Sequence, residues 1–127
     1  MKKFTIIFLS AAAMFCAVVC NAAKMETVAV IGTGDMGDSL GPRFAELGYR
    51  VVYGSRNPAS DKVQALVKNT GDNASATTQM EAAQQADIVL TAVPWPAMEM
   101  VAQSLGNLDG KILIDVSMPF KQGLENG

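Results

Sequence analysis

The chain has 127 residues, a formal net charge of −2, no histidine and two cysteines, and half of its residues are hydrophobic. This length suits one domain with its own core, and the weak acidity argues against nucleic acid as a partner. With so few cysteines and no histidine, zinc hydrolase and thiol chemistry are poorly supported from the outset.

Residues 1–23 have the features of a secretory signal peptide. Lys2 and Lys3 form a positively charged start, an apolar stretch follows, and small residues near Ala23 offer a cleavage site. We therefore expect a cleaved leader over 1–23, a domain over 24–127, and a secreted or periplasmic product that leaves the membrane after cleavage. A retained leader that anchors the protein is the alternative, because about 17 to 20 apolar residues suffice to span a bilayer.

Cleavage there changes both the charge and the available chemistry. The remaining 104 residues hold all 12 acidic residues but 8 of the 10 basic ones, because Lys2 and Lys3 are removed, so the net charge becomes −4. This again argues against nucleic acid. Cys16 and Cys20 both lie in 1–23, so residues 24–127 contain neither cysteine nor histidine, and we expect no disulfide and no metal site of that type.

A glycine-rich turn follows the first predicted strand, which we expect over 27–31. The segment Gly32-Thr-Gly-Asp-Met-Gly37 leads from it into a helix expected over 35–47. Gly32 permits the tight turn, Gly34 lets backbone N–H groups approach a pyrophosphate, and Gly37 lets the helix lie close to the strand. Such glycine spacing also occurs in ordinary turns, but its position between a strand and a helix favours a dinucleotide site with phosphates at the helix N-terminus.

The second predicted strand, over 50–53, determines which dinucleotide is favoured. Enzymes that use NAD usually end this strand with a carboxylate that binds the ribose 2′-hydroxyl and repels a 2′-phosphate. Here Gly54-Ser-Arg-Asn57 follows instead, and Ser55 and Arg56 offer a hydroxyl and a planar guanidinium that suit a phosphate. The segment therefore predicts NADP; the alternative is that Arg56 is a solvated loop residue beside Pro58.

Apolar runs alternate with helical segments through the rest of the chain, which indicates repeated βαβ units. Right-handed crossovers then predict an α/β fold, a Rossmann-type doubly wound parallel sheet in the order 3-2-1-4-5 that we expect to be truncated after strand five. The weakest strand prediction is 74–77, because it is only slightly apolar. The remaining strands are expected over 74–77, 88–93 and 111–116, and the remaining helices over 60–68, 79–85 and 97–105.

Val93, Pro94 and Trp95 follow the fourth strand at the carboxyl edge of the sheet, where open α/β sheets bind ligands. Trp95 could form a wall of the cleft there. Alternatively, it packs over the start of the next helix as part of its N-terminal cap.

Four segments together resemble the NADP-binding domain of the coenzyme F420-dependent NADP oxidoreductases. They are Gly32-Thr-Gly-Asp-Met-Gly37, Tyr53-Gly-Ser-Arg-Asn-Pro58, Ala92-Val-Pro-Trp95 and Ile112-Leu-Ile-Asp-Val-Ser117. The N-terminal reductase domain of the STEAP metalloreductases is similar, and the broader grouping includes pyrroline-5-carboxylate reductase. The resemblance extends from Val28 to about Phe120, and its most specific element is Gly-Ser-Arg.

The resemblance implies hydride transfer between NADPH and a flavin-like, deazaflavin-like or metal-linked acceptor. Such a reaction depends on orientation more than on an acid or base, because the cofactor carries the chemistry, and no catalytic side chain is assigned. The implied contacts are Gly32, Thr33, Gly34, Asp35, Met36 and Gly37 with the pyrophosphate, Ser55, Arg56 and Asn57 with the 2′-phosphate, and Val93, Pro94 and Trp95 on the nicotinamide side.

Two further expectations concern what the domain does with its cofactor and its surface. A different class of function is an exported, non-catalytic module that uses the same cleft to bind NADP or another phosphorylated ligand. A five-stranded sheet of this kind also leaves apolar surface near Trp95, Val116 and Phe120. We therefore expect a homodimer or a partner subunit that covers this surface.

Overall fold

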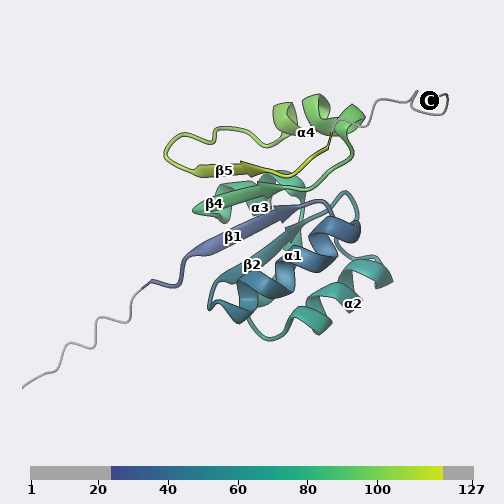
Figure 1. Cartoon of the computed structure of the whole chain (residues 1–127), viewed down its shortest axis with the longest axis vertical. Helices are drawn as coiled ribbons and strands as arrows, with labels where there is room; N and C mark the ends of the chain where they lie inside the picture. The colour runs from purple at the N-terminus through teal and green to yellow at the C-terminus, as the bar shows by residue number, and fades with distance from the viewer. Residues whose placement is uncertain (1–23, 119–127) are drawn as a thin grey trace, which may run out of the picture.

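Five parallel strands form the centre of the protein, and helices cover both faces of the sheet (Figure 1). The computed structural model describes residues 24–118, so the leader predicted over 1–23 and the segment 119–127, which includes Phe120, lie outside the described residues. Within 24–118 there is no helix with the length and apolar character needed to cross a bilayer.

The strands are β1 (Thr27–Ile31), β2 (Arg50–Gly54), β3 (Ala74–Thr77), β4 (Ile88–Thr91) and β5 (Ile112–Asp115). The helices are α1 (Asp35–Glu46), α2 (Asp61–Thr70), α3 (Gln79–Gln85), the 3-10 turn η1 (Trp95–Ala97) and α4 (Met98–Ser104).

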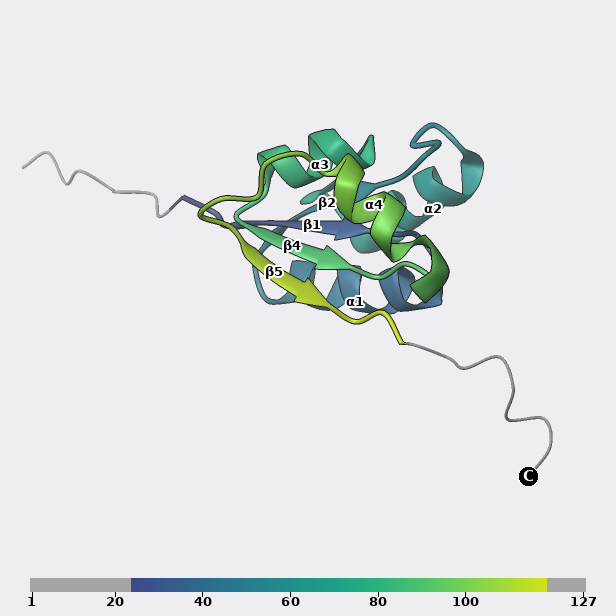
Figure 2. The same cartoon turned by 90° about the horizontal axis from the view of Figure 1, so that it is seen from above.

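The strand order is β3-β2-β1-β4-β5, which confirms the predicted α/β fold of the Rossmann type. β1 lies at the centre, where Val30 is paired with Tyr53 of β2 and with Leu90 of β4. Helices α1 and α2 pack against one face, and α3 and α4 against the other. Figure 2 shows α1 on the opposite side of the strands from α3 and α4.

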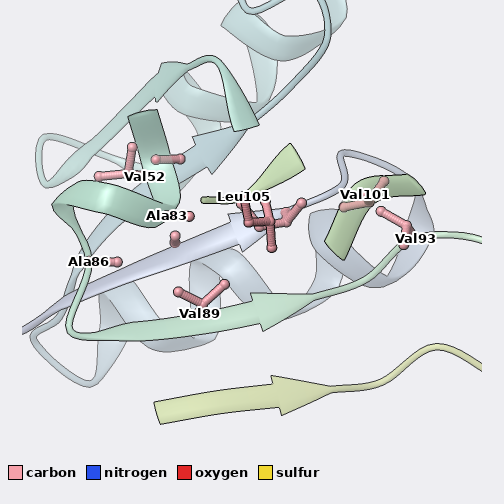
Figure 3. Close-up of a cluster of buried hydrophobic side chains, with 10 residues drawn as sticks. Val52, Ala83, Ala86, Val89, Val93, Val101 and Leu105 are labelled. Carbon is pink, nitrogen blue, oxygen red and sulfur yellow. The ribbon is translucent and has the colours of Figure 1, made fainter. Parts of the chain in front are cut away.

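The central strands form because their residues are suited to burial on both faces. β1 reads Thr-Val-Ala-Val-Ile and all five residues are buried, as a parallel strand between two helical layers requires. Figure 3 shows the cluster on the α3 and α4 face, where Val52 and Val89 of the sheet face Ala83 of α3 and Leu105, which follows α4. β3 forms over 74–77 as predicted, although its residues are only half-buried.

One difference from the predicted bounds lies after β4. This strand ends at Thr91, two residues before the predicted end at position 93, and η1 precedes α4. Pro94 and Pro96 are the reason, because neither has an N–H group to extend a strand ladder or an α-helix. The chain instead makes one tight turn, in which the N–H of Ala97 donates to the carbonyl of Pro94.

Candidate functional site

The carboxyl ends of the central strands meet at one edge of the sheet and are held there by backbone hydrogen bonds. The N–H of Gly32 donates to the carbonyl of Gly54 at 3.2 Å, which ties the end of β1 to the end of β2. The N–H of Ala92 donates to the carbonyl of Ile31 at 2.8 Å and ties β4 to β1 in the same way. This edge is therefore rigid, and it is the edge at which open α/β sheets bind ligands.

A cavity of about 790 Å³ opens at this edge. Its volume falls within the range of about 300 to 1,000 Å³ that small-molecule and cofactor sites occupy. The structure brings eight of the predicted site residues together in its lining, and they come from three separate segments of the chain. They are Gly32, Thr33, Gly34, Ser55, Arg56, Asn57, Val93 and Pro94.

The three glycines of the turn after β1 have three different structural reasons. Gly32 has a φ of +111°, and a Cβ there would collide with the carbonyl oxygen of Ala92. A Cβ at Gly37 would collide with the carbonyl oxygen of Gly32, so glycine is what lets α1 lie against the turn. A Cβ at Gly34 would meet no protein atom within 4 Å. Gly34 is the N-cap of α1, so the open space beside it lies at a helix N-terminus, where an anion is favoured.

The loop after β2 holds Arg56 in a fixed turn. The side-chain oxygen of Ser55 accepts the N–H of Asn57 at 3.2 Å, and the N–H of Ser60 donates to the carbonyl of Asn57 at 3.2 Å. From α2, the amide of Gln64 donates to the carbonyl of Pro58 at 2.8 Å and braces the far side of the loop. An exposed guanidinium on a braced loop loses less conformational freedom when it binds a phosphate.

Lys62 is a lining residue that the sequence interpretation missed. It lies in the first turn of α2 and lines the same cavity as Arg56. The ion pairs found between residues 24 and 118 are Lys24 with Asp87 and Arg43 with Glu46, so neither Arg56 nor Lys62 has a carboxylate partner there. One signal for Lys62 was available: a cation in the first turn of a helix is opposed by the helix dipole, so its presence there calls for another reason.

The opposite wall of the cavity comes from α4 and the turn before it; Val93 and Pro94 of that turn were predicted, whereas the residues of α4 were missed. This wall is mainly apolar, and the hydroxyl of Ser104 donates to the carbonyl of Val101 at 2.7 Å. No sequence motif identifies a helix that lines a cavity with one of its sides, because its amphipathic pattern is the same as that of any surface helix. The further lining residues are Gly54, Ser60, Lys62, Val63, Gln79, Ala92, Ala97, Met100, Val101 and Ser104.

Four of the predicted contact residues do not line the cavity. Asp35 and Met36 are exposed in the first turn of α1, and Gly37 is buried against Gly32. Trp95 begins η1 with half of its surface exposed and does not line the cavity. The reason is the turn at Pro94, which leaves the indole on the outer surface.

The end of β5 is ordered by a carboxylate that also lies outside the cavity lining. One oxygen of Asp115 accepts the N–H of Ser117 at 2.8 Å and the hydroxyl of buried Thr91 at 3.0 Å. These bonds, above all the one from the Ser117 backbone, hold the pKa of Asp115 below its ordinary value. Asp115 therefore acts as a charged brace between β4 and the chain that follows β5.

Residues 27–119 match the family described as NADP oxidoreductase, coenzyme F420-dependent. The chain belongs to this family. The resemblance predicted from four sequence segments is therefore confirmed. Within it, the chain is 33% identical over 102 residues to the F420-dependent NADP reductase of Methanothermobacter thermautotrophicus, an alignment that covers 76% of this chain and 44% of that protein.

Two other relatives extend the comparison. Metalloreductase STEAP3 of Rattus norvegicus is 35% identical over 95 residues, which cover 75% of this chain and 18% of that protein. The crystal structure of a proposed F420-dependent NADP reductase from Arthrobacter sp. FB24 superposes with a TM-score of 0.67 at 26% identity, covering 76% of this chain and 48% of that one. The chain thus spans less than half the length of each of these relatives.

Proposed function

We propose that this domain binds NADPH and forms the cofactor-binding part of an NADP(H)-dependent oxidoreductase. The observation that carries the proposal is the pairing, in one cavity, of a glycine turn that leaves room for a pyrophosphate with two cations, one on the loop after β2 and one at the start of α2, that have no carboxylate partner among residues 24–118. Gly34 borders the open space at the N-terminus of α1, and Arg56 and Lys62 line the same cavity. The family membership supports the same cofactor class.

The preference for NADPH over NADH follows from the charges after β2. In residues 54–57 no aspartate or glutamate is available to bind a ribose 2′-hydroxyl or to repel a 2′-phosphate. Arg56 offers a planar, permanently charged fork to a phosphate, and Lys62 adds a point charge in the same cavity. The cost of placing two cations together is offset when the 2′-phosphate binds between them.

When bound, NADPH would supply two electrons as a hydride from its nicotinamide ring. A flavin or deazaflavin would take up the hydride together with a proton from water, whereas a ferric acceptor would take the two electrons on two ferric ions, with release of a proton. The residues of this chain position the cofactor: the turn after β1 holds its phosphates, and the apolar wall from α4 keeps water from one side. No acid or base is required from the protein, which suits a cavity whose lining contains no carboxylate.

The acceptor we propose is a flavin or deazaflavin, with a metal-linked acceptor as the second choice. Support comes from the relatives, which are an F420-dependent NADP reductase and a metalloreductase. We also propose a homodimer or a partner subunit, because Trp95 and the strand β5 carry exposed apolar surface among residues 24–118. The non-catalytic binding module predicts the same cofactor affinity without turnover.

Cofactor titration tests the proposal directly. We expect the purified protein to bind NADPH at least about tenfold more tightly than NADH, measured by the fluorescence of the reduced nicotinamide, which corresponds to about 1.4 kcal/mol. Equal affinities would overturn the NADP assignment. Addition of F420, a flavin or a ferric chelate to the NADPH complex then separates the two classes of function: oxidation of NADPH identifies an oxidoreductase, and tight binding without oxidation identifies a binding module.

We further propose that the leader over 1–23 is cleaved and that the protein is secreted or periplasmic. The support is the positively charged start, the apolar stretch and the small residues near Ala23. Mass spectrometry of the protein from its host should find an N-terminus near Ala23 or Lys24. An intact start at Met1 on protein in the cytoplasm would overturn this proposal, and intact protein in the membrane would identify an anchored form.

A further inference from the structure

The outer side of β5 is an edge with no neighbouring strand among residues 24–118 (Figure 2). All four residues of the strand are exposed, and its three apolar side chains, Ile112, Leu113 and Ile114, have exposed fractions of 61%, 52% and 37%. An apolar, unpaired edge strand is a template for pairing with another strand, and soluble proteins normally protect or occupy it.

The backbone of β5 has a defined set of groups available for such pairing. The N–H groups of Ile112 and Val116 donate to the carbonyls of Asp87 and Thr91, both at 3.0 Å, so these residues face β4. Successive residues of a strand direct their backbone groups to alternate sides. The N–H and carbonyl groups of Leu113 and Asp115 therefore point to the open edge.

The side chains of β5 are divided between the two faces of the sheet. Ile112 and Ile114 are in register with Ile88 and Leu90, whose side chains belong to the face covered by α1 and α2. Both isoleucines are exposed, whereas Ile88 and Leu90 are buried. The sheet therefore carries an apolar strip on this face that extends to its edge.

Two opposite charges flank the strand on the other face. The amine of Lys111 donates to the carbonyls of Gln84 and Ala86 at 3.1 and 2.6 Å, and a carboxylate oxygen of Asp115 accepts the hydroxyl of Thr91 at 3.0 Å. Thr91 is in register with Asp115, and Val89 of the same strand belongs to the cluster under α3 and α4. Lys111 and Asp115 are four positions apart, so their side chains lie on the same face, with Leu113 between them.

We propose that β5 pairs antiparallel with β5 of a second copy of this chain, about a two-fold axis that passes through Leu113. In this register Lys111 of each copy lies opposite Asp115 of the other, once at each end of the pair. Ile112 lies opposite Ile114, so four isoleucines meet around the axis on the face of α1. The strand is therefore complementary to itself in charge and in apolar surface, as a two-fold interface requires.

The neighbouring registers are less favourable. In an antiparallel pair about a two-fold axis, facing residues have their side chains on the same face of the sheet. The axis must therefore pass through a residue, and each alternative register centres it on a different residue. Centred on Ile112, the pair would set Asp109 opposite Asp115, which places like charges together. Centred on Ile114, it would set Leu113 opposite Asp115, so the carboxylate would face no opposite charge on the second copy. The register through Leu113 alone satisfies both charges.

The other edge of the sheet does not compete for this role. β3 reads Ala-Ser-Ala-Thr, its residues are half-buried, and it presents no large apolar side chain. Pairing through β5 would also leave the cofactor cavities free, because the strands of the second copy run in the opposite direction and its cavity opens at the opposite end of the joined sheet. Cofactor binding and dimer formation can therefore be measured separately.

Charge reversal tests both the partner and the register. With the protein purified from a host that expresses the whole chain, we expect sedimentation to show a dimer that Lys111→Glu and Asp115→Lys each weaken at least about tenfold, because like charges then lie opposite at both ends. A one-to-one mixture of the two variants should restore the dimer, since every facing pair is again opposite in sign. Lys68→Glu, on the exposed surface of α2, is the control for net charge and should leave the dimer intact.

Restoration in the mixture distinguishes pairing from a structural role, because mixing cannot repair an intrachain bond lost in either variant. NADPH affinity and circular dichroism confirm that each variant is folded. The proposal is overturned if the unaltered protein is monomeric at all concentrations. The edge of β5 would then not be occupied by a second copy of this chain. The proposal is also overturned if both variants remain dimers, or if each is a folded monomer and the mixture stays monomeric.

Discussion

The two sides of this domain differ in how much of their own surface they bury. On the β1 and β2 side, all strand residues except Arg50 are buried, and hydrogen bonds hold the glycine turn and the loop of Arg56. On the β5 side, every strand residue is exposed, and Trp95 and Met100 have exposed fractions of 50% and 69%. The part of the fold that we propose to hold phosphates is well buried among residues 24–118, whereas the part beyond β4 has exposed apolar surface.

Under the proposed function, this difference assigns cofactor recognition and acceptor recognition to separate parts of the fold. The phosphate side requires only close backbone turns and a few charges, which a short βαβ segment can provide. An acceptor ring must be enclosed from several directions, and residues 24–118 provide one apolar wall for it. Substitutions on the phosphate side should therefore alter NADPH binding without altering assembly, and substitutions on β5 should do the reverse.

The largest effect is expected from Gly34→Val. A side chain at Gly34 enters open space and the residue has an ordinary φ of −85°, so the fold should persist while the pyrophosphate is displaced. We expect NADPH and NADH affinities to fall together by about 100-fold or more, equivalent to about 2.8 kcal/mol. Isothermal titration with both cofactors measures this, and Ala65→Val on the exposed face of α2 is a control for added bulk. Unchanged affinity in a folded variant would place the pyrophosphate elsewhere.

Arg56→Ala should have a smaller and more selective effect. Removing the guanidinium should lower NADPH affinity about tenfold or more and leave NADH affinity nearly unchanged, because only NADPH carries the 2′-phosphate. Arg43→Ala is the matched control, since Arg43 pairs with Glu46 on α1 and does not line the cavity. Parallel fluorescence titrations of the two cofactors provide the measurement. An equal loss for both cofactors would mean that Arg56 acts on the shared part of the dinucleotide.

Lys62→Ala should weaken NADPH binding by about threefold, because an exposed amine contributes less than a forked guanidinium. The effect should shrink as salt is raised, since exposed charges are screened within about 10 Å at 0.1 M ionic strength. Titration of NADPH at several salt concentrations checks both points, with Lys68→Ala as the control on the same helix. An NADPH affinity that equals that of the unaltered protein at low salt would remove Lys62 from the site.

The smallest effect is expected from Asp87→Asn, at the amino end of the sheet where β1, β4 and β5 meet. The pKa of Asp87 is lowered, first by the N–H of Thr27, which donates to its carboxylate at 3.0 Å. A lowered folded pKa contributes stability that is fully present above the unfolded pKa and is lost as pH falls through the folded value. The variant should therefore melt slightly below the unaltered protein at neutral pH, and the two should converge in acid. Thermal melts across pH test this, and a difference that persists in acid would contradict the charge explanation.

Much of the fold could be predicted from the sequence because its signals are local. β1, β3 and α3 have the predicted bounds, and the order of the sheet follows from alternating strands and helices with right-handed crossovers. The end of β4 and the start of α4 could not be predicted as well. There, Pro94 and Pro96 interrupt both ladders, and the outcome depends on the tight turn that replaces them.

The sequence by itself determined the glycine turn, the cation after β2 and the order of the strands, because each depends on residue type and spacing within a short segment. Only the tertiary structure decided which side chains share the cavity. Lys62 lines it because Gln64 and the Pro58 loop fix the start of α2, and Trp95 does not because the turn at Pro94 leaves it half-exposed. The position of a side chain after a turn depends on contacts with residues far along the chain, and local periodicity carries no information about them.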